Sequence, residues 1–101
     1  TAVNTGIITV GSGSQGITLK DGADIINDTG AGIFSSGINS VGIYADKYSE
    51  ISNSGNMQVG NNGIGYYLDN SKLSITGGNF DISNLGILVY GFNRNIIIKC
   101  K

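Results

Sequence analysis

Short apolar segments that follow a glycine recur along this chain at intervals of about two dozen residues. One set of segments begins at Gly6, Gly30, Gly55 and Gly78, which are separated by 24, 25 and 23 residues. Apolar and polar residues alternate after three of these glycines, which is the period of a strand with one buried face. Two further sets recur in the same order, one opening at Gly16, Gly42, Gly65 and Gly86, the other covering residues 23–27, 49–53 and 73–77. Each repeat therefore predicts three short strands joined by turns.

A repeat this short cannot bury an apolar face by itself and must stack on its neighbours. Stacking places like segments side by side as parallel strands about 4.8 Å apart. The sequence therefore predicts an all-β solenoid with about four rungs of 20–26 residues. We expect four interior columns: Ile17/Ile43/Tyr66/Ile87, Leu19/Ala45/Leu68/Val89, Ile25/Ile51/Ile75 and Val10/Val59/Ile82.

Turn residues fit the same scheme. Asn27 and Asn53 fall at equivalent places, where stacked Asn side chains bond along the stack. Glycines at the corners are expected to supply the positive φ of sharp turns. Helices are disfavoured, because a glycine interrupts every window of about ten residues and costs roughly 1 kcal/mol in a helix interior.

Composition excludes several classes of function. The formal net charge is −1, and no Lys/Arg cluster precedes the last residues, so the basic stripe of a nucleic-acid binder is missing. No apolar run approaches the roughly 20 residues of a membrane-spanning helix. Hydrophobic residues make up 40% of the chain, which is enough to build a core.

The motifs resemble those of a known family. Asn4-Thr5-Gly6 and Asn53-Ser54-Gly55, the Gly-Ile-Thr and Gly-Ile-Tyr starts, and Gly-Gly-Asn-Phe at 77–80 are similar to autotransporter passenger domains. These are type V secreted adhesins of Gram-negative bacteria, and the likeness is greatest to the Asn/Gly/Ile-rich passengers of fusobacteria-like species. The resemblance covers residues 1–91 and implies a right-handed parallel β-helix.

The same resemblance implies a function and a location. The chain would be a structural or adhesive stalk segment of a virulence-associated passenger, displayed outside the cell. The parent protein would be anchored in the outer membrane by a C-terminal β-barrel outside this chain. Its partners would be a host or bacterial surface protein or glycan, with no nucleic acid and no membrane-spanning part in this segment.

Residues 92–101 depart from the repeat. Ile96 and Ile98 are spaced like a last strand, but Lys99-Cys100-Lys101 has no counterpart upstream, which favours a truncated or frame-shifted end. Cys100 is the only cysteine, so no internal disulfide forms.

No catalytic, cofactor-binding or metal-binding residue is assigned, and we expect neither an enzyme nor a cofactor. The chain has no His, which removes the triads built on it and the commonest metal ligand. The alternative enzyme is a β-helix that cleaves polysaccharide with a carboxylate pair. For that role Asp21, Asp46 and Asp69 would form an acidic column, although solvated strand ends explain them more simply. The other carboxylates are Asp24, Asp28, Glu50 and Asp81.

Other motifs have simpler structural explanations. Tyr44 and Tyr67 are expected on the outer face of adjacent rungs, as a stiffening ladder rather than a grip for a sugar or partner. Gly77–Asp81 is one defective copy of a calcium-binding repeat, and Gly11–Gly16 precedes a strand where a phosphate loop needs a helix. Asn-Ser-Val-Gly-Ile at 39–43 leaves a trimeric adhesin head as a third possibility, although those repeats are shorter.

Overall fold

The computed structural model describes residues 2–92 and 95–98, and this part of the chain contains β-strands and no helix. The strands form three parallel sheets. Sheet A contains β1 (Ala2–Asn4), β4 (Asp24–Asn27), β7 (Glu50–Asn53), β10 (Lys72–Ile75) and β13 (Asn95–Ile98). Sheet B contains β2 (Ile7–Val10), β5 (Gly32–Ser35), β8 (Asn56–Val59) and β11 (Phe80–Ile82). Sheet C contains β3 (Gln15–Leu19), β6 (Ser40–Asp46), β9 (Gly63–Asp69) and β12 (Ile87–Phe92).

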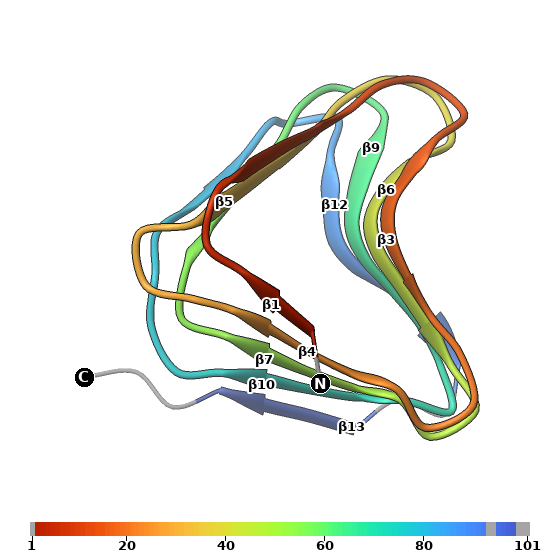
Figure 1. Cartoon of the computed structure of the whole chain (residues 1–101). Coiled ribbons are helices and arrows are strands. Elements are labelled where there is room, and N and C mark those ends of the chain that lie inside the picture. Colours follow the sequence, from red (N-terminus) through yellow and green to blue (C-terminus); the bar gives the residue numbers. More distant parts are fainter. Residues whose placement is uncertain (1, 93–94, 99–101) are drawn as a thin grey trace.

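The chain coils through sheets B, C and A in turn, so that each rung supplies one strand to each sheet. Figure 1 looks along the coil and shows a three-sided cross-section, with sheet A below, sheet B at the upper left and sheet C at the right. The chain runs clockwise as it recedes from the viewer, which is a right-handed coil (Figure 1). The predicted parallel β-solenoid of about four turns is confirmed.

Side chains that alternate along each strand fill the space between the sheets. The buried cluster consists of Leu19, Ile25, Ile33, Ile43, Ala45, Ile51, Met57, Val59, Tyr66, Leu68, Leu73 and Ile75. Strands β7 and β8 show the pattern most clearly, because exposed and buried residues strictly alternate along both. The solenoid interior therefore contains one apolar cluster that continues through the rungs.

Pairing of the strands confirms part of the predicted columns and corrects the rest. Val10, Val59 and Ile82 share a column, with Ser35 between the first two. Ile25 and Ile51 stack as predicted, but their next neighbour is Leu73, and Ile75 stands beside Asn53. In the fourth rung, Val89 continues the column of Ile17, Ile43 and Tyr66 in place of Ile87, and Gly91 continues that of Leu68 in place of Val89.

A ladder of asparagines runs through three rungs of sheet A. Asn4 Nδ2 donates to Asn27 Oδ1 at 3.0 Å, and Asn27 Nδ2 donates to Asn53 Oδ1 at 2.7 Å. Asn53 Nδ2 closes the ladder on the carbonyl of Gly55 at 2.9 Å. Asn27 and Asn53 are completely buried. The predicted bonding between these two side chains is confirmed, and Asn4 extends it.

We expect Asn27→Ala to lower the free energy of unfolding by about 2 kcal/mol, because it leaves Asn53 Oδ1 buried without a donor. Asn4→Ala is the matched control. It removes one hydrogen bond of the ladder, at its partly exposed end, whereas Asn27→Ala removes the bonds to both Asn4 and Asn53, so Asn4→Ala should cost clearly less. Urea unfolding of both variants measures the difference. Equal losses would show that the ladder does not act through burial of its middle member.

The predicted positive φ is found at corner glycines such as Gly22 and Gly30. Glycines near the start of the sheet C strands have a different role. None of Gly16, Gly42 and Gly65 has a positive φ. A Cβ on Gly42 would instead lie 2.6 Å from the carbonyl oxygen of Gly65 and 3.2 Å from Ile33 Cγ2. These glycines therefore let the backbone of sheet C approach the next rung and the side chains of sheet B. The bow of sheet C toward the interior is visible in Figure 1.

Positive φ occurs mainly in the turns, and not only at glycine. The turn from β3 to β4 places it at Asp21 and Gly22, with φ of 55° and 82°. The equivalent turn from β6 to β7 places it at Lys47 and Tyr48, with φ of 48° and 68°. Both turns thus hold two successive residues in the left-handed region, which is unfavourable for a side chain as bulky as that of Tyr48.

Tyr66 lies inside the core, where its hydroxyl is buried without a hydrogen-bond partner among the described residues. Burial raises the pKa of Tyr66. Above about pH 10, the ordinary pKa of tyrosine, the unfolded chain ionises while the folded chain keeps its proton. The free energy of unfolding must then fall as pH rises, because the folded state binds more protons than the unfolded state.

We expect Tyr66→Phe to raise the free energy of unfolding by about 1 kcal/mol at pH 7, because it removes an unsatisfied buried hydroxyl. The gain should widen above about pH 10. Tyr67→Phe is the control, since Tyr67 is the next residue of β9 and lies on its outer face, and its effect should stay within about 0.5 kcal/mol. Chemical unfolding at pH 7 and pH 11 gives both quantities. A less stable Tyr66→Phe protein would contradict this account of the core.

Beyond the fourth rung, β13 pairs with β10 in parallel, and Ile96 lies beside Leu73. The Ile-x-Ile spacing in the tail thus belongs to a strand of sheet A. Arg94, Lys99, Cys100 and Lys101 lie outside the described residues, and with them the prediction about the end of the tail. No helix in the described part of the chain has the length and apolarity to cross a membrane.

Candidate functional site

Stacked aromatic rings on the outer face of sheet C form the most ordered surface feature. Tyr44 and Tyr67 occupy equivalent positions of β6 and β9, with ring centroids 5.0 Å apart and planes inclined by 21°. Tyr90 continues the column on β12, at 5.2 Å from Tyr67. Phe92 lies edge-on to Tyr67 and Tyr90. We call these four side chains the aromatic ladder.

The aromatic ladder is built by the solenoid repeat itself. Each ring projects outward because its neighbours in the strand point inward, such as Ile43 and Ala45 on either side of Tyr44. Stacking covers one face of Tyr44 and a face of Tyr67 with the neighbouring ring. Since sugars bind aromatic rings by their faces, this geometry favours the predicted stiffening role over a grip for a sugar.

The predicted acidic column is only partly formed. Asp46 and Asp69 lie beside each other at the ends of β6 and β9, and Phe92 takes the next place. Asp21 does not belong to this column. Leu19 pairs with Ala45, which brings Lys20 into line with Asp46, and Asp21 forms an ion pair with Lys47 at 3.6 Å. The three-carboxylate column is therefore wrong, because the register of the first turn differs by one residue.

Asp46 and Asp69 affect the pKa of a tyrosine in the neighbouring aromatic ladder. The pKa of Tyr44 is raised, first by burial and then by the negative charges of Asp46, Asp69 and Tyr67. Asp46 Oδ1 is buried and has no hydrogen-bond partner among the described residues. This oxygen is turned away from solvent, so it is poorly placed to receive a proton from a substrate outside.

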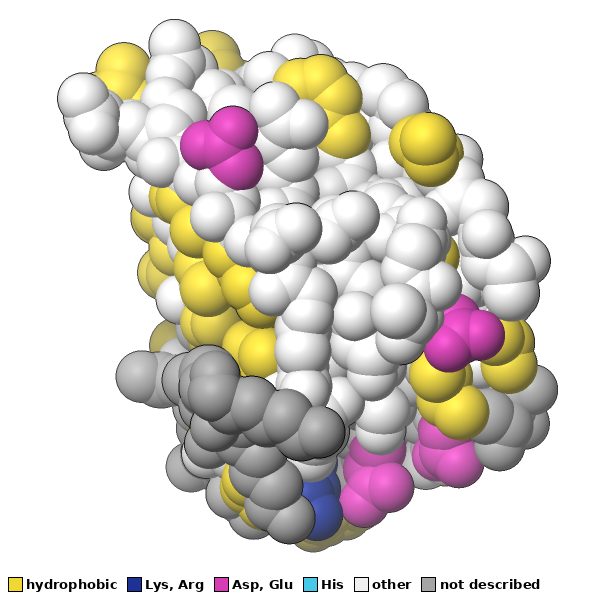
Figure 2. All heavy atoms as spheres, turned by 90° about the vertical axis from the view of Figure 1, so that its left-hand side faces the viewer, with side chains coloured by type: hydrophobic (Ala, Val, Ile, Leu, Met, Phe, Trp, Pro, Cys, Tyr) yellow, Lys and Arg dark blue, Asp and Glu magenta, His cyan; other side chains and the backbone are white. Residues whose placement is uncertain are grey.

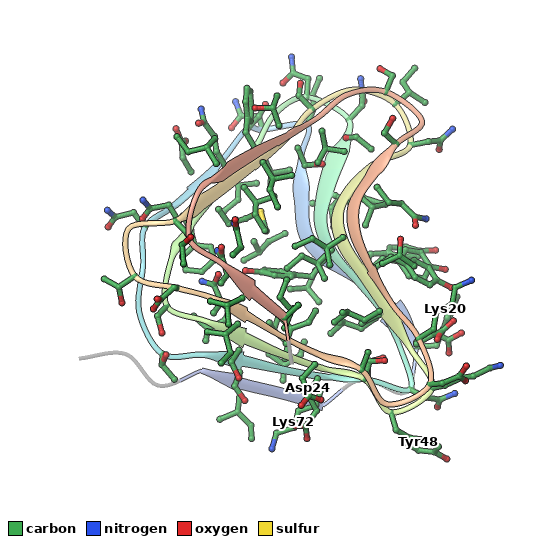
Figure 3. All side chains as sticks on the ribbon, in the orientation of Figure 1. Lys20, Asp24, Tyr48 and Lys72 are labelled. Atoms are coloured by element: carbon green, nitrogen blue, oxygen red, sulfur yellow. The ribbon has the colours of Figure 1, made fainter. Side chains whose placement is uncertain are left out.

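The remaining carboxylates are scattered over the surface. Asp24 and Glu50 pair in register on sheet A, Asp28 follows β4, and Asp81 lies beside Gln58 on sheet B. Figure 3 shows Asp24 and Lys72 on the outer side of sheet A. No three His, Cys, Asp or Glu side chains come together as a metal site among residues 2–92 and 95–98.

The two glycine motifs lie at the starts of strands, and one corner of the coil carries an exposed tyrosine. Gly11–Gly16 forms the turn into β3 and the start of that strand, and Gly77–Asp81 leads into β11. Tyr48 is 82% exposed as a residue, and Figure 3 shows its side chain extending outward from the corner between sheets C and A.

Sequence reasoning missed Tyr90 and Phe92 as members of the aromatic ladder. The signal was present, because Tyr90 follows Tyr67 by 23 residues, the same step that separates Tyr67 from Tyr44.

Comparisons of the chain with protein-family models, with curated proteins and with solved structures found no match. The residues and the fold themselves must therefore carry any functional conclusion.

Proposed function

We propose that this chain is a β-helical stalk segment of a cell-surface adhesin of the autotransporter type. The observation that carries the proposal is the continuity of the three sheets, which pass through every rung with their strands in register. Such a stack ties each rung to the next by backbone hydrogen bonds and apolar columns. A stack of this kind is suited to a rigid spacer segment that holds other domains in a fixed position.

Side-chain contacts between successive rungs agree with a mechanical role. The aromatic ladder and the asparagine ladder both link rung to rung along the axis of the coil. The enzyme alternative has less support, because Asp21 is engaged with Lys47 and one carboxylate oxygen of Asp46 is covered from solvent. The resemblance to autotransporter passengers adds the setting: secretion, outer-membrane anchoring through another part of the protein, and adhesion to host or bacterial surfaces.

Surface display tests this proposal. The chain is placed between a heterologous outer-membrane anchor and a small binding domain of known affinity, and the cells are treated with proteinase K. We expect export, and a binding domain that stays attached after the treatment. An Ile43→Asp variant is the control, since a carboxylate forced into the core unfolds the chain and exposes it to cleavage. A wild-type chain that is retained inside the cell, or cut as fast as the variant, would refute the proposal.

A further inference from the structure

We propose that a hollow on the outer face of sheet B binds one uncharged sugar residue. The hollow has a volume of about 240 Å³. It lies over β5 and β8, and its principal lining residues are Ile7, Gly32, Phe34, Asn56, Gln58 and Asn79. This site is separate from the aromatic ladder, and it does not depend on the proposed stalk function.

A missing side chain creates the hollow. Gly32 pairs with Ile7 on one side and Asn56 on the other, so it is the middle member of an outward column. A Cβ placed on Gly32 would meet no atom within 4 Å, and its φ is not positive. Neither close packing nor backbone conformation therefore requires glycine here, in contrast to Gly42. The open space is what the glycine provides.

Phe34 supplies an aromatic face. It is the next outward residue of β5, it is partly exposed, and among the described residues it stacks on no other ring. The rings of Tyr44 and Tyr67 already cover each other, whereas the ring of Phe34 stays available. The C–H face of a pyranose packs on such a ring, and its hydroxyls then point to the sides.

Carboxamides stand where those hydroxyls would lie. The side chains of Gln58 and Asn79 make no hydrogen bond within the described part of the chain, and each offers both donors and an acceptor. Asn56 Oδ1 accepts the backbone N–H of Asn79 at 3.0 Å, which fixes Asn56 and leaves its own N–H groups. An aromatic face bordered by both donors and acceptors matches a sugar better than it matches an apolar side chain.

The charge and the volume of the hollow restrict the class of ligand further. None of the described residues that line the hollow is charged. Asp81 lies beyond Gln58 in the same column, outside the lining. Figure 2 shows that uncharged side chains cover most of the face turned to the left in Figure 1, with adjacent charged side chains along its lower edge. A volume below that of sites for drug-sized ligands indicates a single residue rather than an oligosaccharide.

Titration of the ¹⁵N-labelled chain, followed by amide NMR, tests the site. The probes are glucose, galactose, mannose, fucose, N-acetylglucosamine and N-acetylgalactosamine, with glucuronic acid and sialic acid as charged counterparts. We expect saturable shifts at Phe34, Asn56 and Gln58 with at least one uncharged sugar, and at least tenfold weaker binding of the acids. Shifts with none of the sugars, or with the acids alone, would overturn the proposal.

Three variants locate the binding. Gly32→Leu starts from a Cβ position with no atom within 4 Å and extends into the hollow, so it should abolish the shifts. Ser52→Leu makes a similar addition on the outer face of sheet A and should leave them unchanged. Gln58→Ala changes only an exposed side chain, so it stays informative if Gly32→Leu does not fold, and it should weaken binding at least tenfold. Unchanged binding in Gln58→Ala and in a folded Gly32→Leu protein would show that the sugar binds elsewhere. Neither result bears on surface display of the stalk.

Discussion

Gly42→Ala is expected to lower the free energy of unfolding by about 3 kcal/mol or more, at the upper end of the cost of overpacking a core. The new methyl would lie 2.6 Å from the carbonyl oxygen of Gly65, 3.2 Å from Ile33 Cγ2 and 3.3 Å from Met57 Cε. The two side chains can give way, but the carbonyl belongs to the backbone of the next rung. The clash can therefore be relieved only if β6 and β9 move apart, and backbone hydrogen bonds between these strands are then lost.

Gly11→Ala is the matched control for this prediction. Its Cβ would meet nothing within 4 Å, and its φ is not positive. The free energy of unfolding should therefore stay the same or rise by up to about 1 kcal/mol, because alanine restricts the unfolded chain. Urea unfolding, followed by far-UV circular dichroism, measures both variants. A Gly42→Ala protein as stable as Gly11→Ala would mean that the rungs do not approach as closely as the structure shows.

Ile51→Ala is expected to cost about 3 kcal/mol, within the range for truncation of a large buried aliphatic side chain. Ile51 is 1% exposed and stands between Ile25 and Leu73 in one column. Truncation of Ile51 removes packing contacts with the rungs on both sides. The backbone hydrogen bonds of β7 to β4 and β10 prevent the strands from closing the gap.

Ser52→Ala, the next residue of β7, is the control because its side chain faces solvent. It should change the free energy of unfolding by no more than about 0.5 kcal/mol. The same urea experiment serves for both. If Ile51→Ala and Ser52→Ala were equally stable, residue 51 would not be an interior position and the assignment of faces along β7 would be wrong.

The fold class and the direction of most side chains could be predicted from the sequence, because alternation within a strand is a strong signal. The register in which the strands of the later rungs pair could not be predicted. A slip of two residues keeps every side chain on its own face, so a pattern of period two does not detect it. The pattern therefore predicts Ile75 over Ile51, where the structure has Leu73, and Ile87 over Tyr66, where the structure has Val89.

Surface features were harder to predict, because they depend on which residues are neighbours in different rungs. Asp21 was matched to Asp46 by its distance along the chain, but the first turn brings Lys20 there. The hollow over Gly32 could not be foreseen at all. The glycine that opens it looks in sequence like the glycines of the repeat, and only the register sets it between Ile7 and Asn56.

Disulfide formation across sheet A tests the central claim, that equivalent strands of successive rungs stack directly in the register described. In a Cys100→Ser background, Ser52→Cys is combined either with Ser74→Cys, its partner in register, or with Thr76→Cys, two residues further on. Partners in register lie about 4.8 Å apart, within the range that a disulfide spans, whereas the shifted pair lies about 8 Å apart. We predict rapid cross-linking of residues 52 and 74 under mild oxidation and little of residues 52 and 76. Absence of the first cross-link, or preference for the second, would contradict the account.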